Sequence, residues 1–139
     1  MNIAVRYQSR GGNSKAVAEA IAKEAGVTAE PLDVPLDRQV DLLFVGGGVY
    51  AWNIDDTLRA YLQNLDPDTI KTVAAFTTGG NFSGTGKIAA EVKARGIAVC
   101  ETAMSMRMGV QNYAGKKGYA TLSDKQNRKV ADFVKNTIK

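Results

Sequence analysis

Glycine clusters mark three places along the 139-residue chain where a ligand could approach the backbone. Nine of the fourteen glycines lie in these clusters, and each cluster follows a predicted strand. Glycine lets backbone N–H groups come close to a bound group because it has no Cβ. In an open α/β sheet, ligands bind beyond the carboxyl ends of the strands. The sequence therefore predicts one shared pocket, bordered by residues 11–12, residues 46–48, and Gly79 and Gly80 with Gly84 and Gly86.

The first of these segments combines groups that suit a phosphate dianion. It offers two hydroxyls, an amide and a guanidinium, and it runs directly into a predicted helix; its residues are Ser9, Arg10, Gly11, Gly12, Asn13 and Ser14. The N–H groups and the dipole at the start of a helix attract an anion, and a guanidinium adds charged hydrogen bonds. The alternative is a plain turn in which Asn13 caps the helix. Because two further glycine clusters are predicted at the same sheet edge, we favour phosphate binding.

The composition excludes several kinds of catalytic site. The sequence has no histidine, so a Ser-His or Cys-His nucleophile pair and an imidazole metal ligand are ruled out. The one cysteine, Cys100, can form neither an internal disulfide nor a thiolate metal site by itself, and we interpret it as a small buried hydrophobic residue. Redox chemistry would therefore need a bound cofactor, and no metal is expected.

Apolar spacing predicts strands that alternate with helices. Strands are expected at residues 2–7, 27–34, 41–46, 71–78 and 97–103. Helices are expected from Ser14 to Gly26, after a cap at Asn53, around residues 88–92, and after a capping box of Ser123 and Gln126. This alternation is typical of an α/β domain with a doubly wound, mostly parallel sheet and helices on both faces. We assign residues 1–139 to one such domain.

Two segments do not fit this alternation. Residues 35–40 join the second strand to the third and are too few for the usual crossover helix, so we expect a tight crossing or a shorter second strand. Residues 104–122 are expected to be a loop, although Met104, Met106 and Met108 alternate as strand residues do.

Two other nucleotide-binding patterns are weaker. Residues 46–51 match the dinucleotide pattern G-x-G-x-x-G/A, but they belong to the third strand rather than the first. The position about twenty residues further on is Lys71 instead of an acid. Gly86 and Lys87 are similar to the end of a phosphate-binding P-loop, but Ile88 stands where that motif needs Ser or Thr. We reject the P-loop and give the dinucleotide pattern little weight.

In the order and spacing of these segments the chain resembles a short flavodoxin. Residues 9–14 are similar to the family's phosphate loop, T/S-x-T-G-N-T, except that Gly11 replaces a threonine hydroxyl. The resemblance implies a five-stranded parallel sheet of order 2-1-3-4-5 that binds FMN, with residues 9–14 contacting the phosphate. It also implies contacts to the flavin ring from two later segments: Val49, Tyr50, Ala51, Trp52 and Asn53, and Thr77, Thr78, Gly79, Gly80 and Phe82.

The flavin ring needs a flat apolar slot with a few polar groups at its edge. Tyr50 falls at the family's aromatic stacking position and is our first choice, with Trp52 second. Trp52 could instead pack over the following helix, and Phe82 could instead lie in the core. Ala51 stands where many flavodoxins have glycine. In that family the peptide at this position turns over when the flavin N5 gains a proton, and alanine makes this change more costly than glycine does.

The resemblance implies electron transfer through FMN, to or from a redox partner protein such as a reductase or a ferredoxin-like protein. One alternative is an NAD(P)H-dependent FMN reductase of quinones, nitro compounds or free flavins. A second alternative is a module that has kept the fold and lost the flavin. The sequence pI of about 9.2 keeps these alternatives open, because flavodoxin carriers are usually acidic.

Charge is unevenly distributed along the chain. Residues 1–70 contain 6 Lys or Arg against 10 Asp or Glu, a net charge of −4, and residues 71–139 contain 12 against 4, a net charge of +8. Lys116 and Lys117 lie near two tyrosines, but a solvated basic loop explains them better than a nucleic-acid surface. No apolar run is long enough to cross a membrane, and the first residues enter a strand at once. We therefore expect a cytoplasmic protein that binds neither nucleic acid nor membrane.

Overall fold

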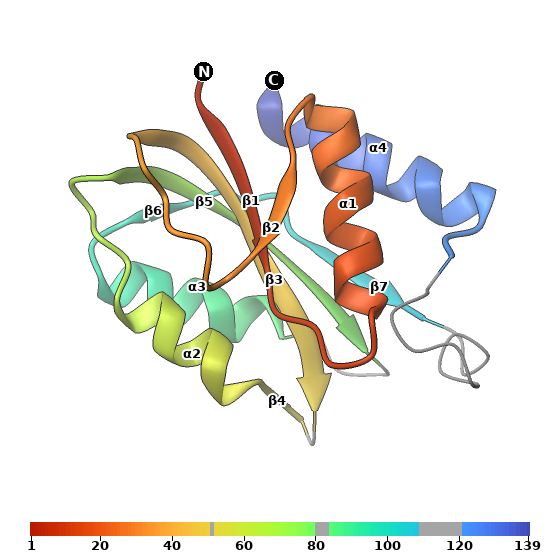
Figure 1. Ribbon diagram of the computed structural model, residues 1–139, viewed down its shortest axis with the longest axis horizontal. Helices are drawn as coiled ribbons and strands as arrows, with labels where there is room; N and C mark the ends of the chain where they lie inside the picture. The colour runs from red at the N-terminus through yellow and green to blue at the C-terminus, as the bar shows by residue number, and fades with distance from the viewer. Residues whose placement is uncertain (51, 80–83, 109–120) are drawn as a thin grey trace.

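The computed structural model describes residues 1–50, 52–79, 84–108 and 121–139, which form a parallel sheet between helices (Figure 1). The strands along the sheet run in the order β2-β1-β3-β5-β6, all parallel, while β7 also pairs with β5 and β4 pairs antiparallel with β3. Their bounds are β1 (Ile3–Tyr7), β2 (Ala29–Pro31), β3 (Val40–Tyr50), β4 (Asn53–Ile54), β5 (Ile70–Gly79), β6 (Ala98–Val99) and β7 (Met104–Arg107). With β5 and β6 as the fourth and fifth predicted strands, the predicted order 2-1-3-4-5 and the fold class are confirmed.

Helices cover both faces of the sheet. One face carries α1 (Asn13–Ala25) and α4 (Asp124–Ile138), and the other carries α2 (Asp56–Gln63) and α3 (Thr85–Ala94) (Figure 1). Each pair encloses its own apolar core against the sheet. The carboxyl ends of β1, β3 and β5 lie together at the lower edge of the molecule in this view (Figure 1).

Successive side chains of β3 point alternately into the two cores. Phe44 packs under α1 and α4, where its ring meets Phe133 edge-on with 5.6 Å between ring centroids. Leu43 and Val45 point to the other face and pack under α2 and α3. All three are fully buried, which explains the uninterrupted apolar run in this strand.

The helix ends follow the capping residues, with one exception. Gly26 ends α1 in the left-handed conformation at φ 76°, and Ser123 with Gln126 forms the capping box that starts α4, both as predicted. The prediction that Asn53 caps α2 is wrong. The cap is Asp55, whose carboxylate accepts a 2.7 Å hydrogen bond from the backbone N–H of Thr57, because Asn53 is held in the β4 pairing with β3.

The third strand is longer than the predicted 41–46 and includes the second glycine cluster. Residues 46–48 pair with Phe76, Thr77 and Thr78 of β5, so they are strand residues and not a loop after the strand. A Cβ on Gly46 would lie 1.9 Å from the carbonyl oxygen of Phe76. The glycine is therefore required here because two strand backbones come close together.

Two other predicted strands are shorter than expected, because the backbone N–H groups of the first predicted residues donate to the end of the preceding helix. The second strand covers 29–31 instead of 27–34, since the N–H of Val27 donates to Ala22 at the end of α1 and the N–H of Val34 closes a turn onto Pro31. The predicted strand 97–103 begins at residue 98 because Ile97 donates to Val92 of α3.

The predicted fifth strand also ends early, at residue 99, as β6. The chain leaves the sheet after Cys100, whose N–H donates to Val73, and a strand that was not predicted, β7, then pairs further along β5. The loop predicted over 104–122 is thus wrong for 104–107, and residues 109–120 lie outside the described residues. Met104, Met106 and Met108 are buried in the core under α4.

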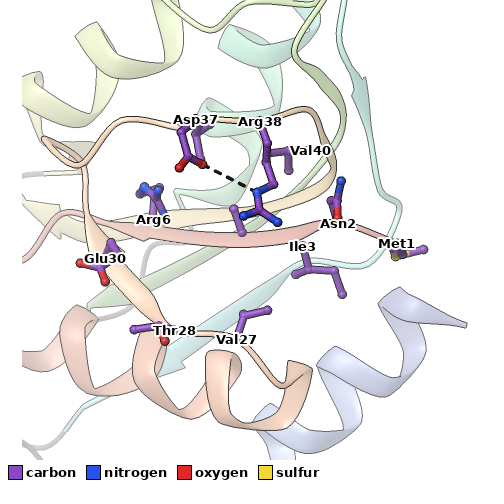
Figure 2. Close-up of a pocket in the computed structure, with 12 residues that line it drawn as sticks. Met1, Asn2, Ile3, Arg6, Val27, Thr28, Glu30, Asp37, Arg38 and Val40 are labelled. Carbon is purple, nitrogen blue, oxygen red and sulfur yellow. Dashed lines mark ion pairs between the residues drawn. The ribbon is translucent and has the colours of Figure 1, made fainter.

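The short link between β2 and β3 is held by the buried Arg6 of β1. Its guanidinium donates to the carbonyl oxygens of Val34 at 2.9 Å and Pro35 at 3.1 Å. Arg6 thereby satisfies backbone groups that a crossover helix would have paired internally. Beside the link a hollow of about 480 Å³ opens at the amino ends of β1 and β2, where Figure 2 shows the exposed pair of Arg38 and Asp37.

Candidate functional site

Side-chain hydrogen bonds join the ends of β1, β3 and β5 at the carboxyl edge of the sheet. The hydroxyls of Ser14, at the start of α1, and Thr78, in β5, are 2.7 Å apart. The Gln8 amide accepts from the N–H of Gly48 at 3.2 Å and donates to the Tyr50 hydroxyl at 3.5 Å. The three segments that the sequence placed at one pocket are therefore brought together.

The start of α1 has the groups of an anion cradle. Gly12 precedes the helix at φ 95°, and its N–H donates to the Ser9 hydroxyl at 3.0 Å. Asn13 is only 5% exposed, and within the described part of the chain neither its amide nitrogen nor its amide oxygen has a hydrogen-bond partner. Asn13 is the first residue of the helix and not its cap, so the alternative prediction of an Asn13 cap is wrong. A buried amide without a partner is costly, and a ligand at the helix start would provide one.

Arg10 forms a compact cluster with Asp55 and Tyr50. Its Nε and Nη2 atoms donate to one Asp55 oxygen at 3.0 and 2.7 Å, and its guanidinium lies over the Tyr50 ring, 3.8 Å from the centroid. Burial of Asp55 would by itself raise the pKa of the carboxyl. Hydrogen bonds from Arg10 and Thr57 and the positive charge of Arg10 outweigh that effect and lower the pKa. Arg10 is thus positioned at the edge of the cradle by a carboxylate on a different element.

Tyr50 lies back over the carboxyl edge of the sheet. A Cβ on Gly48 would be 2.4 Å from the Tyr50 hydroxyl oxygen, so the tyrosine depends on the glycine beneath it. Gln8 and Asp55 were not predicted to be site residues. The signal available for Gln8 was a polar residue that closes an apolar strand, and the signal for Asp55 was an acid at the position that caps the next helix.

Trp52 and Asn53 lie further out. Trp52 is 69% exposed and adopts a left-handed backbone conformation at φ 66°. The side-chain oxygen of Asn53 accepts from the N–H of Ile54 and from Arg59. Val49 packs beside Gly79, where a Cβ would lie 3.1 Å from the Val49 side chain. Ala51, predicted to lie in this segment, is outside the described residues.

The two threonines of the third segment use their hydroxyls inside the protein. Thr77 donates to Ser105 at 3.4 Å, and Thr78 pairs with Ser14. Both threonines are buried, and their contact to a flavin ring through backbone or hydroxyl groups stays a prediction. They also hold β5 to its neighbours. Gly80 and Phe82 lie outside the described residues.

The other group of chemical interest is remote from this edge. Cys100 is half-buried beyond the end of β6, and burial raises the pKa of its thiol. This agrees with its interpretation as a hydrophobic residue, because a raised pKa disfavours the reactive thiolate.

Within the described ranges, no helix is long and apolar enough to cross a membrane.

Comparison with solved structures identifies the fold. No protein-family model and no curated protein matches the sequence. A flavodoxin from the domain Archaea is 22% identical over 100% of both chains, with a TM-score of 0.60. Oxidised Flavodoxin 2 from Bacillus cereus is 14% identical over 99% of this chain and 98% of that one, with a TM-score of 0.73. A WrbA-like flavodoxin from Agrobacterium tumefaciens is 16% identical over 98% of both, with a TM-score of 0.64. The likeness extends over nearly the whole of this chain, which therefore has the flavodoxin-like fold.

Proposed function

We propose that this protein binds FMN at the carboxyl edge of its sheet and carries electrons to or from a partner protein. The observation that supports this best is the buried Asn13 amide, which has no protein partner among the described residues and lies at the start of a 13-residue helix. An FMN phosphate would accept a hydrogen bond from that amide and from the helix N–H groups. The resemblance to flavodoxins, in residues 9–14 and in fold, points to the same ligand.

The residues at the start of α1 fit the phosphate of this group. Ser9, Asn13 and Ser14 surround the start of α1 and would hold the phosphate, with the Arg10 guanidinium nearby. The ring would lie between the segment that contains Tyr50 and the end of β5. When bound, FMN would supply one- or two-electron chemistry, while the chain would position it and exclude water from it.

The charge of Arg10 gives the site a specific electrostatic character. Asp55 neutralises part of this charge, but the Arg10 side chain remains 60% exposed at the edge of the cradle. A cation there would stabilise an anion at the start of α1 through charged hydrogen bonds. We therefore assign Arg10 to anion binding, with Asp55 as the residue that positions it.

A visible absorption spectrum tests flavin binding directly. The purified protein, once FMN is added and the excess removed, should retain a bound flavin spectrum. A protein that stays colourless would support the flavin-free module instead.

Two kinetic assays then separate an electron carrier from an enzyme. A carrier should oxidise NAD(P)H only when a separate reductase is present. An FMN-dependent reductase should oxidise NAD(P)H by itself with a quinone as acceptor, which would overturn the carrier proposal while leaving FMN binding intact. The basic composition is what keeps this second function under consideration.

A further inference from the structure

We propose that the hydroxyl group of Tyr50 donates a hydrogen bond to the edge of the bound flavin ring, and that Gln8 fixes the direction of this donation. The proposal rests on the proposed flavin site and concerns the ring of the ligand, whereas the cradle at the start of α1 concerns its phosphate. The ligand group that fits such a donor is an acceptor at the edge of a flat ring, either a carbonyl oxygen or an unprotonated ring nitrogen. The flavin ring has both.

The orientation of the Gln8 amide follows from the backbone beside it. Gln8 comes directly after β1 and is only 9% exposed. Its oxygen Oε1 accepts a hydrogen bond from the backbone N–H of Gly48 at 3.2 Å. A flipped amide would bring N–H donors against each other at this place, so the oxygen faces Gly48 and the nitrogen Nε2 faces Tyr50.

The direction of the Tyr50 hydrogen bond follows in turn. An amide nitrogen carries donors only, so the Tyr50 hydroxyl oxygen accepts from Nε2 of Gln8, at a distance of 3.5 Å. The hydroxyl also has one hydrogen of its own to donate. Among the residues that the structure describes, its one hydrogen bond is the one from Gln8. The hydroxyl hydrogen is therefore left for a ligand at the carboxyl edge of the sheet.

Neighbouring groups hold the Tyr50 side chain in place. The Arg10 guanidinium covers one face of the ring, 3.8 Å from the centroid, and is itself bound to Asp55. The phenol end lies against Gly48, where a Cβ would be 2.5 Å from Cζ of the tyrosine. While Arg10 stays in this position, a flavin ring cannot stack on the covered face. A contact through the hydroxyl, at the edge of the ring, needs no movement of Arg10.

Titration of the flavin-free protein with FMN and with riboflavin tests the donor. Tyr50→Phe removes one oxygen atom and keeps the aromatic ring, so it should weaken the binding of both flavins by the same factor. That factor should be about fivefold, the order of one net hydrogen bond. The absorption bands of the bound flavin should also shift, because its ring loses a hydrogen bond. Tyr61→Phe, in a half-buried tyrosine of α2, is the matched control and should change neither affinity.

Gln8→Glu tests the direction of donation. At about pH 8, which keeps the new carboxyl ionised, this side chain has only acceptors and takes the hydrogen of Tyr50 while still accepting from Gly48. Riboflavin, which lacks the phosphate charge, should then bind about fivefold more weakly. In the Tyr50→Phe background the same substitution should have no further effect, because no hydroxyl remains to be redirected.

The outcomes separate this proposal from the proposed function. FMN affinity that Tyr50→Phe leaves unchanged would overturn the donor role and leave the flavin site standing. Weakening of FMN alone would overturn it as well, because the hydroxyl would then contact the phosphate. Failure of the parent protein to bind either flavin would remove the proposed function together with this inference.

The role of Gln8 has its own decisive result. An effect of Gln8→Glu that persists in the Tyr50→Phe background would come from the new charge itself and would overturn that role. Should Gln8→Glu fail to fold, which circular dichroism would show, the comparison of Tyr50→Phe with the parent protein still decides the donor.

Discussion

Asn13 has a buried side chain without a hydrogen-bond partner in the part of the chain that the structure describes. Its amide is enclosed at the start of α1, and neither polar atom finds a partner in the described ranges. An unpaired buried polar group costs about 1–3 kcal/mol, and such groups in native structures call for an explanation. An anionic ligand at this position would accept a hydrogen bond from the amide nitrogen and so recover part of that cost on binding.

Replacing Asn13 should therefore affect stability and binding in opposite directions. Asn13→Leu removes the unpaired amide at similar size, so we expect the flavin-free protein to gain about 1 kcal/mol of unfolding free energy. FMN affinity should fall at least tenfold. Urea unfolding measures the first effect and flavin fluorescence the second, with Asn136→Ala on the exposed face of α4 as control. A variant that is destabilised and binds FMN normally would show that Asn13 has a structural role only.

Asp55 makes the stability of the folded state depend on pH. Hydrogen bonds from Arg10 and Thr57, together with the charge of Arg10, lower the pKa of its carboxyl in the folded chain despite the opposing effect of burial. The unfolded chain lacks these bonds, so its Asp55 is protonated at a higher pH. The stabilisation is therefore complete above the unfolded pKa and is lost as the pH falls through the lowered folded pKa.

Asp55→Asn should accordingly cost the most stability near neutral pH. The difference in unfolding free energy between the parent protein and the variant should shrink below about pH 4, where the unfolded carboxyl becomes protonated. Urea denaturation between pH 7 and pH 3 measures this difference. Asp56→Asn, one residue along and exposed, is the matched control for the loss of one carboxylate. A difference that is constant with pH would mean that the Arg10–Asp55 contact stabilises through packing alone.

Among the elements, β3 determines the geometry of the site. It pairs with β5 as far as Gly48 and continues to Tyr50, which lies over the carboxyl edge. The close approach of the two strands leaves no space at Gly46, where a Cβ would lie 1.9 Å from a backbone oxygen. By contrast, a Cβ at Gly86 of α3 meets nothing within 4 Å.

Two alanine substitutions should separate these glycines. Gly46→Ala must push two paired strands apart, so we expect a loss of at least about 3 kcal/mol of unfolding free energy. Gly86→Ala should be neutral or add up to about 1 kcal/mol, because alanine favours the helix. Chemical denaturation monitored by circular dichroism compares the two. Equal effects would mean that the approach of β3 to β5 does not constrain the strand.

Hydrophobic periodicity predicted the elements better than it predicted their ends. The buried run of residues 41–46 identified β3. Glycines have no side chains to continue the pattern, so the predicted strand stops at residue 46, whereas β3 continues to Tyr50. The predicted strand 97–103 extends too far because the end of β6 and the start of β7 depend on the stretch of β5 that each strand pairs with. The glycine clusters predicted which segments meet at the carboxyl edge, whereas the Arg10–Asp55 contact joins residues 45 positions apart and could not be predicted from local sequence.

Across the whole molecule, the acidic residues 1–70 and the basic residues 71–139 would favour partners of different charge. We propose, from the resemblance to flavodoxins, that a partner docks around residues 50–56 and 80–86, where Asp55 is buried against Arg10, Asp56 is exposed and Lys87 lies nearby. The basic surplus lies in residues 71–139 and includes Arg107, with Lys116 and Lys117 outside the described residues. Exposed charges act mainly on the rate of encounter, and salt screens them over about 10 Å at 0.1 M.

Electron exchange with an acidic partner such as a ferredoxin should therefore slow as ionic strength rises. A reductase with a basic docking face should show a weaker or opposite trend. Stopped-flow transfer rates across a salt series measure this for the parent protein and for a Lys116→Glu, Lys117→Glu double variant. A salt dependence that the double variant leaves unchanged would place these lysines away from the docking face.

The central claim is that the start of α1 binds the phosphate of a flavin. Titration of the flavin-free protein with FMN and with riboflavin, followed by quenching of flavin fluorescence, tests it most directly because the two ligands differ only in the phosphate. We predict that FMN binds at least tenfold more tightly than riboflavin, as expected for charged hydrogen bonds at a helix start, and that inorganic phosphate competes with FMN. Equal affinities for the two flavins would contradict the assignment of residues 9–14 to phosphate.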